Sequence, residues 1–349
     1  MLAACLTAPS TVELCEVPVP EVPDDGLLLR VDACGICGSD LRRWREGPPA
    51  EAMPVIPGHE VAGTVVACGP RQDRFALGDR LAIAPDIHCG ECYYCQHGLY
   101  NLCDHLAMVG ITPGQPGGLA EYMPLTGLAL RNGIVHRIPN GLDTVLAALS
   151  EPLSSVLAAQ ERVGVSLGDT VLVIGAGPIG CMHLAVARAR GARTIVSQRS
   201  AQRRDMALRF QPDLVIDPQA QDLTAAVRSF TEGRGADVVI CANPQAVTQA
   251  DAVQAVRKGG QVVFFGGLPK ADPFTCLDAN RIHYGEIVVR GAFSYHPTMH
   301  AQALDVLARG LVPAALLITD RFPLAQVAQA FATAAGGGAL KVLVEPHSA

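Results

Sequence analysis

Four cysteines stand close together in the segment HCGECYYCQHGLYNLC. Their spacing is C-x2-C-x2-C-x7-C, and they are Cys89, Cys92, Cys95 and Cys103. Four thiolates this close in sequence can form a closed tetrahedral shell around Zn²⁺, with no position left for water. We therefore expect a structural zinc that stabilises a lobe with little hydrophobic core of its own. His88 and His97 flank the cysteines, and we interpret both as loop residues.

A second group of metal-binding residue types is spread along the chain. Cys37 lies in GICGSD, His59 and Glu60 lie in PGHE, and Glu151 lies in SEPL. Sulfur, nitrogen and oxygen ligands from distant segments are typical of a catalytic zinc, which keeps one coordination position open for water or substrate. A single Cys or His in an apolar stretch is more often a core residue. The combination, and not any one residue, predicts the metal site.

Residues 170–180 read TVLVIGAGPIG and are followed by a helix-like segment. The apolar run 171–174 is typical of a strand buried on both faces. A G-x-G-x-x-G string between a strand and a helix predicts a dinucleotide site. Gly175 permits the tight turn, Gly177 the close approach of a pyrophosphate, and Gly180 the packing of helix on strand. With Pro178 and Ile179 they form the predicted phosphate-binding turn at the helix N-terminus.

The end of the next predicted strand bears on the choice of cofactor. An NAD-selective site places Asp or Glu about 20 residues after the glycines, on the ribose 2′-hydroxyl. Here the strand ends at Ser197, and Gln198 takes the place of the acid. Without a carboxylate, a 2′-phosphate meets no repulsion, and nearby arginines attract it. These arginines are Arg199, Arg203 and Arg204. We predict a preference for NADP(H); the alternative is an NAD site with surface arginines.

Length and composition restrict the class of protein. A chain of 349 residues exceeds what one core usually supports, so two domains are expected. The composition, 49% hydrophobic and 17% charged, is that of a globular protein, and a net charge of −6 argues against nucleic acid or membrane partners. Neither a leader pattern nor a membrane-length apolar run is evident, so we expect a cytoplasmic location. In that compartment the 12 cysteines indicate metal ligands before disulfides.

The hydrophobic pattern changes twice along the chain. Residues 1–151 show short apolar runs broken by Pro and Gly, which favour a β-barrel-like domain. Residues 152–290 alternate strands with helices, the pattern of a doubly wound parallel sheet. The predicted strands there are 171–174, 194–197, 214–216, 237–241, 261–265 and 286–289. Gly266, directly after the fifth strand, is a further predicted cofactor contact. Residues 291–349 end in ALKVLVEP, which we expect to return to the first domain as a strand.

The motifs GICGSD, PGHE, the four-cysteine lobe, SEPL and VIGAGPIG occur in the order found in zinc-dependent medium-chain alcohol dehydrogenases. The chain resembles most closely the sorbitol, threonine and polyol-phosphate dehydrogenase branch of that family, over essentially its whole length. The resemblance implies an α/β protein with a GroES-like β-barrel catalytic domain and a doubly wound Rossmann cofactor domain. It also implies two zinc ions per chain, one catalytic and one structural, and a homodimer or homotetramer.

The resemblance also implies roles for the candidate ligands of the catalytic zinc. Cys37 and His59 are expected to bind the catalytic zinc. Glu60 and Glu151 are expected to share the carboxylate role, one directly and the other through water. In this family the zinc acts as a Lewis acid toward an alcohol or ketone, and the nicotinamide accepts or donates hydride.

Three residues after Cys37 lies Asp40, which by the same resemblance orients a ligand imidazole. Ser39 is expected to take the substrate proton. Relatives commonly carry a histidine three residues after this serine, where the present chain has Arg42. Arginine is not deprotonated in proteins, so the usual proton relay is not expected here. Arg42 is either a recognition residue for an anionic substrate group or a solvated surface residue.

The predicted reaction interconverts a secondary alcohol and a ketone of a small polyol, sugar or cyclitol. Alternatives on the same fold are an L-threonine 3-dehydrogenase-like enzyme, an NAD-dependent polyol dehydrogenase and a zinc-free quinone or enoyl reductase. Zinc-free reductases of this kind lack the ligands of the catalytic zinc, so the presence of Cys37, His59 and Glu60 counts against that alternative. A non-enzymatic zinc ribbon that binds nucleic acid is disfavoured by the acidic balance. Trp44, Phe293 and Tyr295 are candidate pocket walls or core aromatics.

Overall fold

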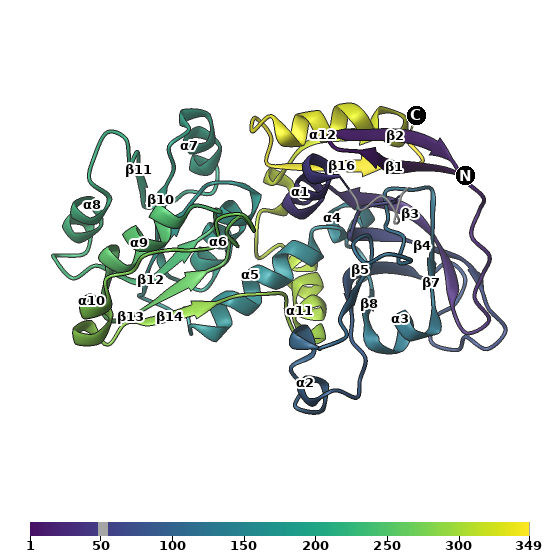
Figure 1. Ribbon diagram of the computed structural model, residues 1–349, viewed down its shortest axis with the longest axis horizontal. Coiled ribbons are helices and arrows are strands. Elements are labelled where there is room, and N and C mark those ends of the chain that lie inside the picture. The colour runs from purple at the N-terminus through teal and green to yellow at the C-terminus, as the bar shows by residue number, and fades with distance from the viewer. Residues whose placement is uncertain (48–54, 349) are drawn as a thin grey trace. The chain divides into compact units, whose positions relative to one another are not determined.

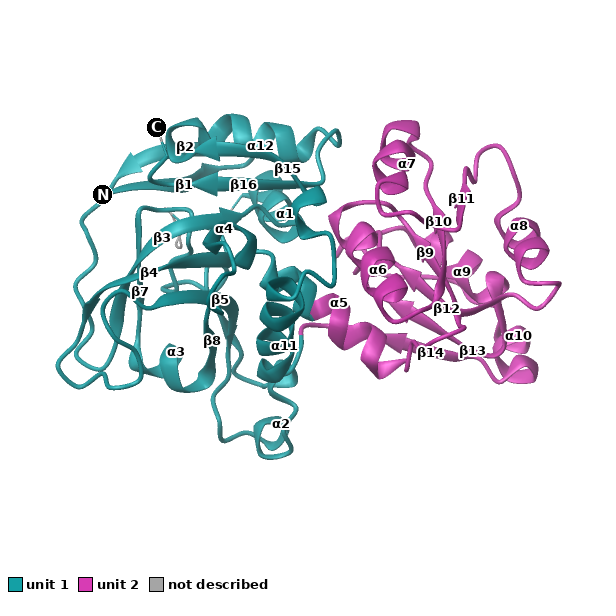
Figure 2. Cartoon of the chain, turned by 180° about the vertical axis from the view of Figure 1, so that it is seen from behind, with its two compact units in different colours: residues 1–154, 295–349 teal, residues 155–294 magenta. Residues whose placement is uncertain are grey.

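The chain, in a computed structural model that describes residues 1–47 and 55–348, forms two compact units. Unit 1 combines Met1–Ser154 with Tyr295–Ala349, and unit 2 is Ser155–Ser294 (Figure 2). These boundaries lie within a few residues of 151 and 290, where the hydrophobic pattern changes. Among the described residues no helix is both long and apolar enough to cross a membrane.

Unit 2 is built on a parallel sheet of six strands in the order β11-β10-β9-β12-β13-β14 (Figure 1). The strands are β9 (Thr170–Ile174), β10 (Arg193–Ser197), β11 (Leu214–Ile216), β12 (Ala236–Cys241), β13 (Val256–Phe264) and β14 (Val288–Gly291). Every residue of β9 is buried, as a central strand covered on both faces requires. Strands β10 and β11 are added on one side of β9, and β12 to β14 are added on its other side. A doubly wound sheet binds its ligands where the strand order changes in this way, here between β9 and β12.

The helices of unit 2 connect these strands. They are α6 (Pro178–Ala189), α7 (Ala201–Leu208), α8 (Leu223–Phe230), α9 (Ala246–Ala255) and α10 (Ala279–Gly285). Three of them begin with a polar side chain that accepts a backbone N–H, as at Ser200, Asp222 and Asp278. α9 ends at Ala255, because Val256 takes extended backbone angles and begins β13.

Unit 1 contains a mixed sheet in the order β15-β16-β3-β4-β5-β6, in which β7 also pairs with β3 and β8 with β5. Its strands are β3 (Leu27–Gly35), β4 (Glu60–Cys68), β5 (Arg80–Ile87), β6 (Ala107–Met108), β7 (Tyr122–Leu125), β8 (Gly133–Arg137), β15 (Ile318–Pro323) and β16 (Lys341–Glu345). A separate hairpin pairs β1 (Leu2–Ala8) with β2 (Thr11–Glu16). The sheet and hairpin share one core, in which Leu29, Ile83 and Phe331 are fully or almost fully buried.

The helices that lie wholly in unit 1 are short, and α11 is the longest of them within the described residues. They are α1 (Gly38–Glu46), α2 (Tyr93–Gln96), α3 (Gly127–Asn132), α4 (Thr144–Ala147), α11 (Pro297–Ala308) and α12 (Val327–Ala335). Three single 3₁₀ turns are η2 (Tyr100–Leu102), η3 (Ala314–Leu316) and η4 (Leu324–Gln326). A longer helix, α5 (Ser150–Arg162), begins in unit 1 and continues into unit 2.

The C-terminal strand, within ALKVLVEP, pairs with a strand of the first unit. β16 lies antiparallel to β3, with Leu343 opposite Gly35 and Val344 opposite Cys34. The backbone N–H of Ile36 continues this pairing by donating to the Val342 carbonyl at 3.0 Å. The last residues of the chain are therefore fixed beside the segment that carries Cys37.

Candidate active site and metal centres

The mixed-ligand group of Cys37, His59 and Glu60 comes together where β3 and β4 pair. Gly35 lies opposite Glu60 in the antiparallel register, so the turn after β3 and the first residue of β4 are neighbours. Cys37 is the residue before α1, and His59 directly precedes β4. One ligand atom from each of Cys37, His59 and Glu60 lies within 4.8 Å of the others. This packing leaves no room for a side chain at Gly35, since a Cβ there would lie 2.0 Å from Glu60 Oε2.

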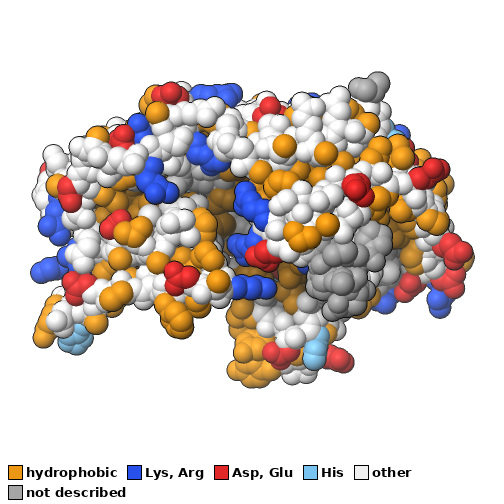
Figure 3. Space-filling model, turned by 45° about the horizontal axis from the view of Figure 1, so that its top comes forward, with side chains coloured by type: hydrophobic (Ala, Val, Ile, Leu, Met, Phe, Trp, Pro, Cys, Tyr) orange, Lys and Arg blue, Asp and Glu red, His pale blue; other side chains and the backbone are white. Residues whose placement is uncertain are grey.

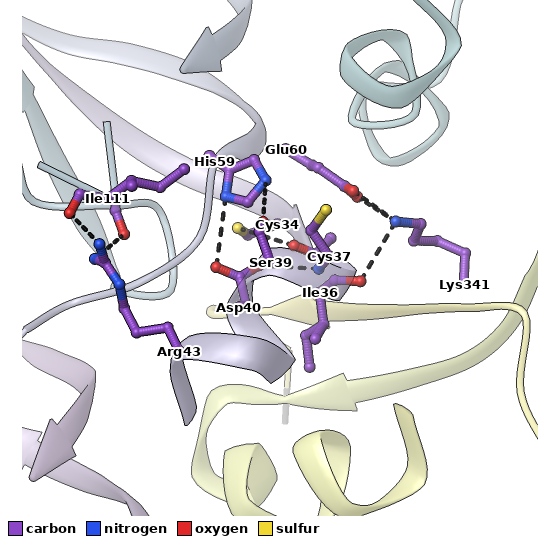
Figure 4. Close-up of polar contacts among 12 residues, drawn as sticks. Cys34, Ile36, Cys37, Ser39, Asp40, Arg43, His59, Glu60, Ile111 and Lys341 are labelled. Atoms are coloured by element: carbon purple, nitrogen blue, oxygen red, sulfur yellow. Dashed lines mark hydrogen bonds and ion pairs between the residues drawn. The ribbon is translucent and has the colours of Figure 1, made fainter. Parts of the chain in front are cut away.

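The His59 imidazole lies between two residues of α1 (Figure 4). Its Nδ1 is 3.4 Å from Asp40 Oδ1, and its Nε2 is 3.3 Å from Ser39 Oγ. The other oxygen of Asp40 accepts the backbone N–H of Cys37 at 2.9 Å, which fixes the carboxylate at the start of the helix. Burial alone would lower the pKa of His59, but Asp40 and Cys37 raise it well above its ordinary value. Asp40 thus faces the nitrogen that a metal bound through Nε2 leaves free.

Glu60 has a partner that the sequence did not indicate. Lys341 Nζ, on β16, lies 2.6 and 2.7 Å from the two Glu60 carboxylate oxygens and 3.3 Å from the Ile36 carbonyl (Figure 4). Both side chains are almost completely buried. Burial would lower the pKa of Lys341, but Glu60, followed by Cys37, raises it. The ammonium and the carboxylate therefore form a buried ion pair beside the metal-binding group.

Glu151 is held differently from Glu60. It lies in the first turn of α5, and its Oε1 accepts a hydrogen bond of 3.0 Å from the Tyr295 hydroxyl. Burial raises the pKa of Glu151 to about 7, against a smaller lowering by the nearby His59. Tyr295 is itself fully buried, so this candidate pocket wall is a hydrogen-bond donor to a predicted metal ligand.

The arginines of α1 have opposite placements. Arg42, which occupies the relay position, is exposed. Arg43 is half-buried and donates to the carbonyls of Gly110 and Ile111, which ties α1 to that loop (Figure 4). Trp44 packs against Phe331 at 6.0 Å between ring centroids and belongs to the core of unit 1.

The four-cysteine lobe brings its sulfurs together. One sulfur from each of Cys89, Cys92, Cys95 and Cys103 lies within 4.8 Å of the others. The Sγ atoms of Cys89 and Cys95 are 3.9 Å apart, and three backbone N–H groups point at sulfurs of the cluster. The two flanking histidines, His88 and His97, stack on Tyr100 and Tyr93, each with 4.2 Å between centroids.

Unit 2 contains a cavity of about 710 Å³ at the carboxyl ends of β9, β10 and β12. Five predicted cofactor residues line it, namely Gly175, Ser197, Gln198, Arg199 and Arg203. The sequence did not indicate Asn243 and Asp251, which also line it. Asn243 closes the floor, because its Nδ2 donates to the Ile174 carbonyl at 3.1 Å.

The glycine-rich turn beside this cavity has the geometry that its sequence predicts. Gly175 has φ +107°, a backbone conformation that L-residues rarely adopt. A Cβ at Gly180 would lie 1.8 Å from the Gly175 carbonyl oxygen, so only glycine permits this approach of α6 to the turn. α6 begins at Pro178 with Ile179 in its first turn, and Gly177 caps it. A Cβ at Gly177 would lie 2.9 Å from Arg203 Nη1, which places that guanidinium over the turn.

Six predicted cofactor residues lie outside the cavity lining, namely Gly177, Pro178, Ile179 and Gly180 of the turn and, farther along the chain, Arg204 and Gly266. Arg204 pairs with Asp217 at 2.9 Å and donates to the Gln198 and Arg199 carbonyls at 2.8 and 2.7 Å. Its guanidinium is therefore already hydrogen-bonded within the protein, and it holds the loop at Gln198 and Arg199 in place. Gly266 follows β13, where a Cβ would lie 2.5 Å from the Asn243 carbonyl. It packs against the cavity floor instead of lining the cavity.

Comparisons with known proteins identify the family. Residues 23–140 match the model of the alcohol dehydrogenase GroES-like domain, and residues 178–309 match that of zinc-binding dehydrogenases. The chain belongs to the zinc-dependent medium-chain alcohol dehydrogenase family. The predicted family and fold class are confirmed.

Among curated proteins, this dehydrogenase is 34% identical to sorbitol dehydrogenase of Bacillus subtilis, over 99% of the chain and 98% of that protein. It is 33% identical to D-arabitol-phosphate dehydrogenase of Enterococcus avium, over 95% and 93%. Among solved structures, it is similar to an NADP-bound chain from Sinorhizobium meliloti 1021 assigned as a zinc-binding dehydrogenase. That match has a TM-score of 0.89 and 33% identity, and covers 99% of each chain. The chain is thus a zinc-type alcohol or polyol dehydrogenase by family.

Both metal groups of this dehydrogenase fit zinc. Tetrahedral ligands at about 2.3 Å place two sulfurs roughly 3.8 Å apart, close to the 3.9 Å between Cys89 and Cys95. The mixed group offers the sulfur, imidazole and carboxylate donors that zinc accepts.

The cavity of unit 2 likewise fits a dinucleotide. Ser197 Oγ is buried at the cavity and has no hydrogen-bond partner among the described residues. Such an orphaned hydroxyl is expected where a ligand supplies the missing partner. The helix N-terminus at Gly177 offers backbone N–H groups to a pyrophosphate.

Proposed function

We propose that this chain interconverts a secondary alcohol and a ketone of a small polyol, sugar or cyclitol, with NADP(H) as the hydride carrier. The observation that carries the proposal is the mixed-ligand group of Cys37, His59 and Glu60, with Ser39 beside the imidazole. The polyol relatives named above support the substrate class, since the chain covers nearly the whole length of each.

Bound zinc supplies a Lewis acid that lowers the pKa of a substrate hydroxyl, and the nicotinamide supplies the hydride acceptor. The protein holds the imidazole in place through Asp40. Ser39 Oγ, 3.3 Å from the ligand nitrogen of His59, is placed to receive the hydroxyl proton. Because Arg42 is exposed and remains charged, the proton then passes from Ser39 to water and not to a side chain at position 42.

We assign Glu60 as the third protein ligand of this zinc and Glu151 as the second carboxylate. Glu60 is the acid whose oxygen lies within 4.8 Å of the Cys37 and His59 ligand atoms. Its oxygens are shared with Lys341, which offsets part of its charge. Glu151, held by Tyr295, would then be the carboxylate that reaches the metal through water.

The preference for NADP(H) rests on the end of β10. Gln198, Arg199 and Arg203 line the cavity where an NAD-selective site places a carboxylate. A guanidinium forms bidentate hydrogen bonds with phosphate, and these are stronger than neutral ones. The related Sinorhizobium meliloti chain, 33% identical, binds NADP. We propose two zinc ions per chain, the second in the four-cysteine lobe.

The test is kcat/KM for a panel of secondary alcohols and ketones, with NADP(H) and NAD(H) in parallel. We expect turnover of polyols and a higher kcat/KM with NADP(H). Arg199→Gln should lower the preference for NADP(H), measured as kcat/KM with NADP(H) divided by kcat/KM with NAD(H), roughly tenfold or more. This is the effect of losing one charge-assisted hydrogen bond. Arg209→Gln, exposed and outside the cavity lining, is the matched control.

Each part of the proposal has its own contradicting result. A higher kcat/KM with NAD(H) contradicts the cofactor assignment alone. Turnover of quinones or enones, but of no alcohol, contradicts the substrate assignment. The homodimer or homotetramer and the cytoplasmic location stay predictions, and light scattering of the purified protein tests the first.

A further inference from the structure

Unit 2 has a second cavity, of about 390 Å³, at the amino ends of β12 and β13. Arg234 lies shortly before β12, and Arg257 and Lys258 lie at the beginning of β13; α8 and α10 contribute one arginine each (Figure 1). The full lining is Arg228, Gly233, Arg234, Arg257, Lys258 and Arg281. The cavity is therefore at the opposite end of the strands from the predicted dinucleotide site.

The charge of this lining is unusual for the chain. Five of its six residues are cationic and none is acidic, although the whole chain has a net charge of −6. Asp237 pairs with Arg257 at 2.6 Å, and the Asp278 carboxylate acts on Arg281 from the start of α10. The other three cations, Arg228, Arg234 and Lys258, form no ion pair with any residue that the structure describes. On the face shown in Figure 3, both basic and acidic side chains are present.

Three of the guanidinium groups are held in place by the backbone. Arg281 donates to the carbonyls of Val253, Gln254 and Val256 at 2.6–2.8 Å, where α9 ends. Arg234 Nε donates to the Thr231 carbonyl at 3.3 Å, and Arg257 Nη1 to the Lys258 carbonyl at 2.8 Å. Each guanidinium has five N–H donors, so each keeps donors free after these contacts. Donors fixed before binding lose little conformational entropy when a ligand arrives.

The remaining two cations have no acceptor. Arg228 and Lys258 are exposed, and neither side chain forms a hydrogen bond or ion pair within the described part of the chain. Burial, followed by the charge of Arg228, lowers the pKa of Arg281, which shows that the two guanidinium groups repel each other. An anion between them would relieve that repulsion.

We propose that this basic cavity binds the pyrophosphate group of a small phosphorylated ligand, such as inorganic pyrophosphate or a nucleoside di- or triphosphate. Guanidinium pairs bidentately with phosphate oxygens, and the cations surround the cavity from α8, β13 and α10 and from the loop before β12. Two linked phosphate groups carry more negative charge and more acceptor oxygens than one, which suits a lining with five cations. The volume lies within the range of about 300–1,000 Å³ typical of small-ligand sites.

The test is isothermal titration of the zinc-loaded protein with inorganic pyrophosphate, ATP and orthophosphate, in the absence and presence of saturating NADP⁺. We expect pyrophosphate and ATP to bind at least tenfold more tightly than orthophosphate, and to do so whether or not NADP⁺ is present. The double variant R228E/K258E should weaken both by tenfold or more. R209E/R309E carries the same charge change on exposed residues outside the cavity and should bind as the wild type does.

Both substituted side chains are exposed and unpartnered, so folding should be retained; R228Q alone provides a second, milder variant with an expected severalfold loss. The proposal is overturned if NADP⁺ displaces pyrophosphate equally well from the wild type and from R228E/K258E, because the ligand is then in the dinucleotide cavity. Equal binding by R228E/K258E and R209E/R309E also overturns it. So does tighter binding of duplex DNA or anionic vesicles than of pyrophosphate with the same dependence on Arg228 and Lys258. Failure of the oxidoreductase assay affects only the proposed function, since this titration needs no turnover.

Discussion

At the scale of single residues, the candidate active site depends on one buried ion pair. Lys341 and Glu60 are almost completely buried and in direct contact, and Glu60 is also the acid that groups with Cys37 and His59. An isolated buried charge costs several kcal/mol, so each member of the pair stabilises the other.

Replacement of Lys341 by Met should therefore destabilise the metal-free protein by about 3–5 kcal/mol, because Glu60 is left as an unpaired buried charge. Zinc should raise the free energy of unfolding of K341M by more than that of the wild type, since the metal then supplies the only counter-charge to Glu60. The double variant E60Q/K341M should recover part of the loss. Denaturant unfolding with and without zinc measures all three, and an unchanged midpoint for K341M would contradict this account. Lys270→Met, at an exposed lysine, is the control.

A second residue-scale prediction concerns His183, which is fully buried in α6. Desolvation lowers its pKa to about 3, whereas the ordinary value is 6.5. The folded state therefore keeps this imidazole neutral, while the unfolded chain takes up a proton as the pH falls below 6.5. The stability that His183 contributes is present above pH 6.5 and is lost progressively between pH 6.5 and about 3.

We expect this one group to cost about 1.4 kcal/mol of unfolding free energy per pH unit below pH 6.5. Urea unfolding at pH 7.0, 6.0 and 5.5, at constant zinc loading, measures the slope. His183→Gln should reduce it by the equivalent of about one proton, because glutamine does not titrate. His97→Gln, at an exposed histidine, should leave the slope unchanged. A wild-type slope in His183→Gln would show that other groups cause the acid sensitivity.

At the scale of elements, three segments far apart in sequence form the mixed-ligand site. The turn after β3 presents Cys37, β4 begins with Glu60, and β16 adds Lys341. The four-cysteine lobe is the opposite case, because a single short segment supplies all its sulfurs. It includes only a four-residue helix, α2, and a 3₁₀ turn, so it has few apolar contacts with which to hold its shape.

The lobe should consequently depend on its metal. C92S/C103S should lower the zinc content by one ion per chain and destabilise the lobe, because a structural site of this kind contributes folding free energy directly. Elemental analysis gives the zinc content, and limited proteolysis within residues 89–103 reports the opening of the lobe. Cys276→Ser, at an exposed cysteine, should change neither. Full zinc content in C92S/C103S would show that this lobe holds no metal.

At the scale of the whole molecule, the two predicted ligand sites belong to separate units. Every residue that lines the dinucleotide cavity lies in unit 2, and every residue of the mixed-ligand group lies in unit 1. Each unit has its own hydrophobic core. Binding of the cofactor and binding of the catalytic metal should therefore be separable by substitution.

Cys37→Ser is expected to remove the catalytic zinc and reduce kcat by at least a hundredfold, because the Lewis acid is lost. The dissociation constant of NADPH should change by less than about threefold, since the cavity that we assign to it is intact; one tenfold step corresponds to about 1.4 kcal/mol. Steady-state kinetics, zinc analysis and NADPH fluorescence titration are the measurements. A tenfold weaker affinity for NADPH would show that the units are energetically coupled.

The sequence alone was sufficient for the features that depend on short stretches of chain. The thiolate spacing, the G-x-G-x-x-G turn at Gly175–Gly180 and the buried strand before it are local patterns. Together with GICGSD, PGHE and SEPL they carried the resemblance that implied the family and the fold class. Gly180 shows why, because the contact that excludes a side chain there is with Gly175, five residues away.

Only the tertiary structure showed which side chains meet across long separations in sequence. Lys341 is 281 residues from Glu60, and Tyr295 is 144 residues from Glu151, so no local pattern links them. Arg204 was predicted to contact the cofactor, yet its ion pair with Asp217 takes it out of the cavity lining. The pairing of β16 with β3, the pairing of β3 with β4 and the loop after β11 determine these partners. A sequence specifies the residues available for such contacts, but the packing of strands selects which of them are made.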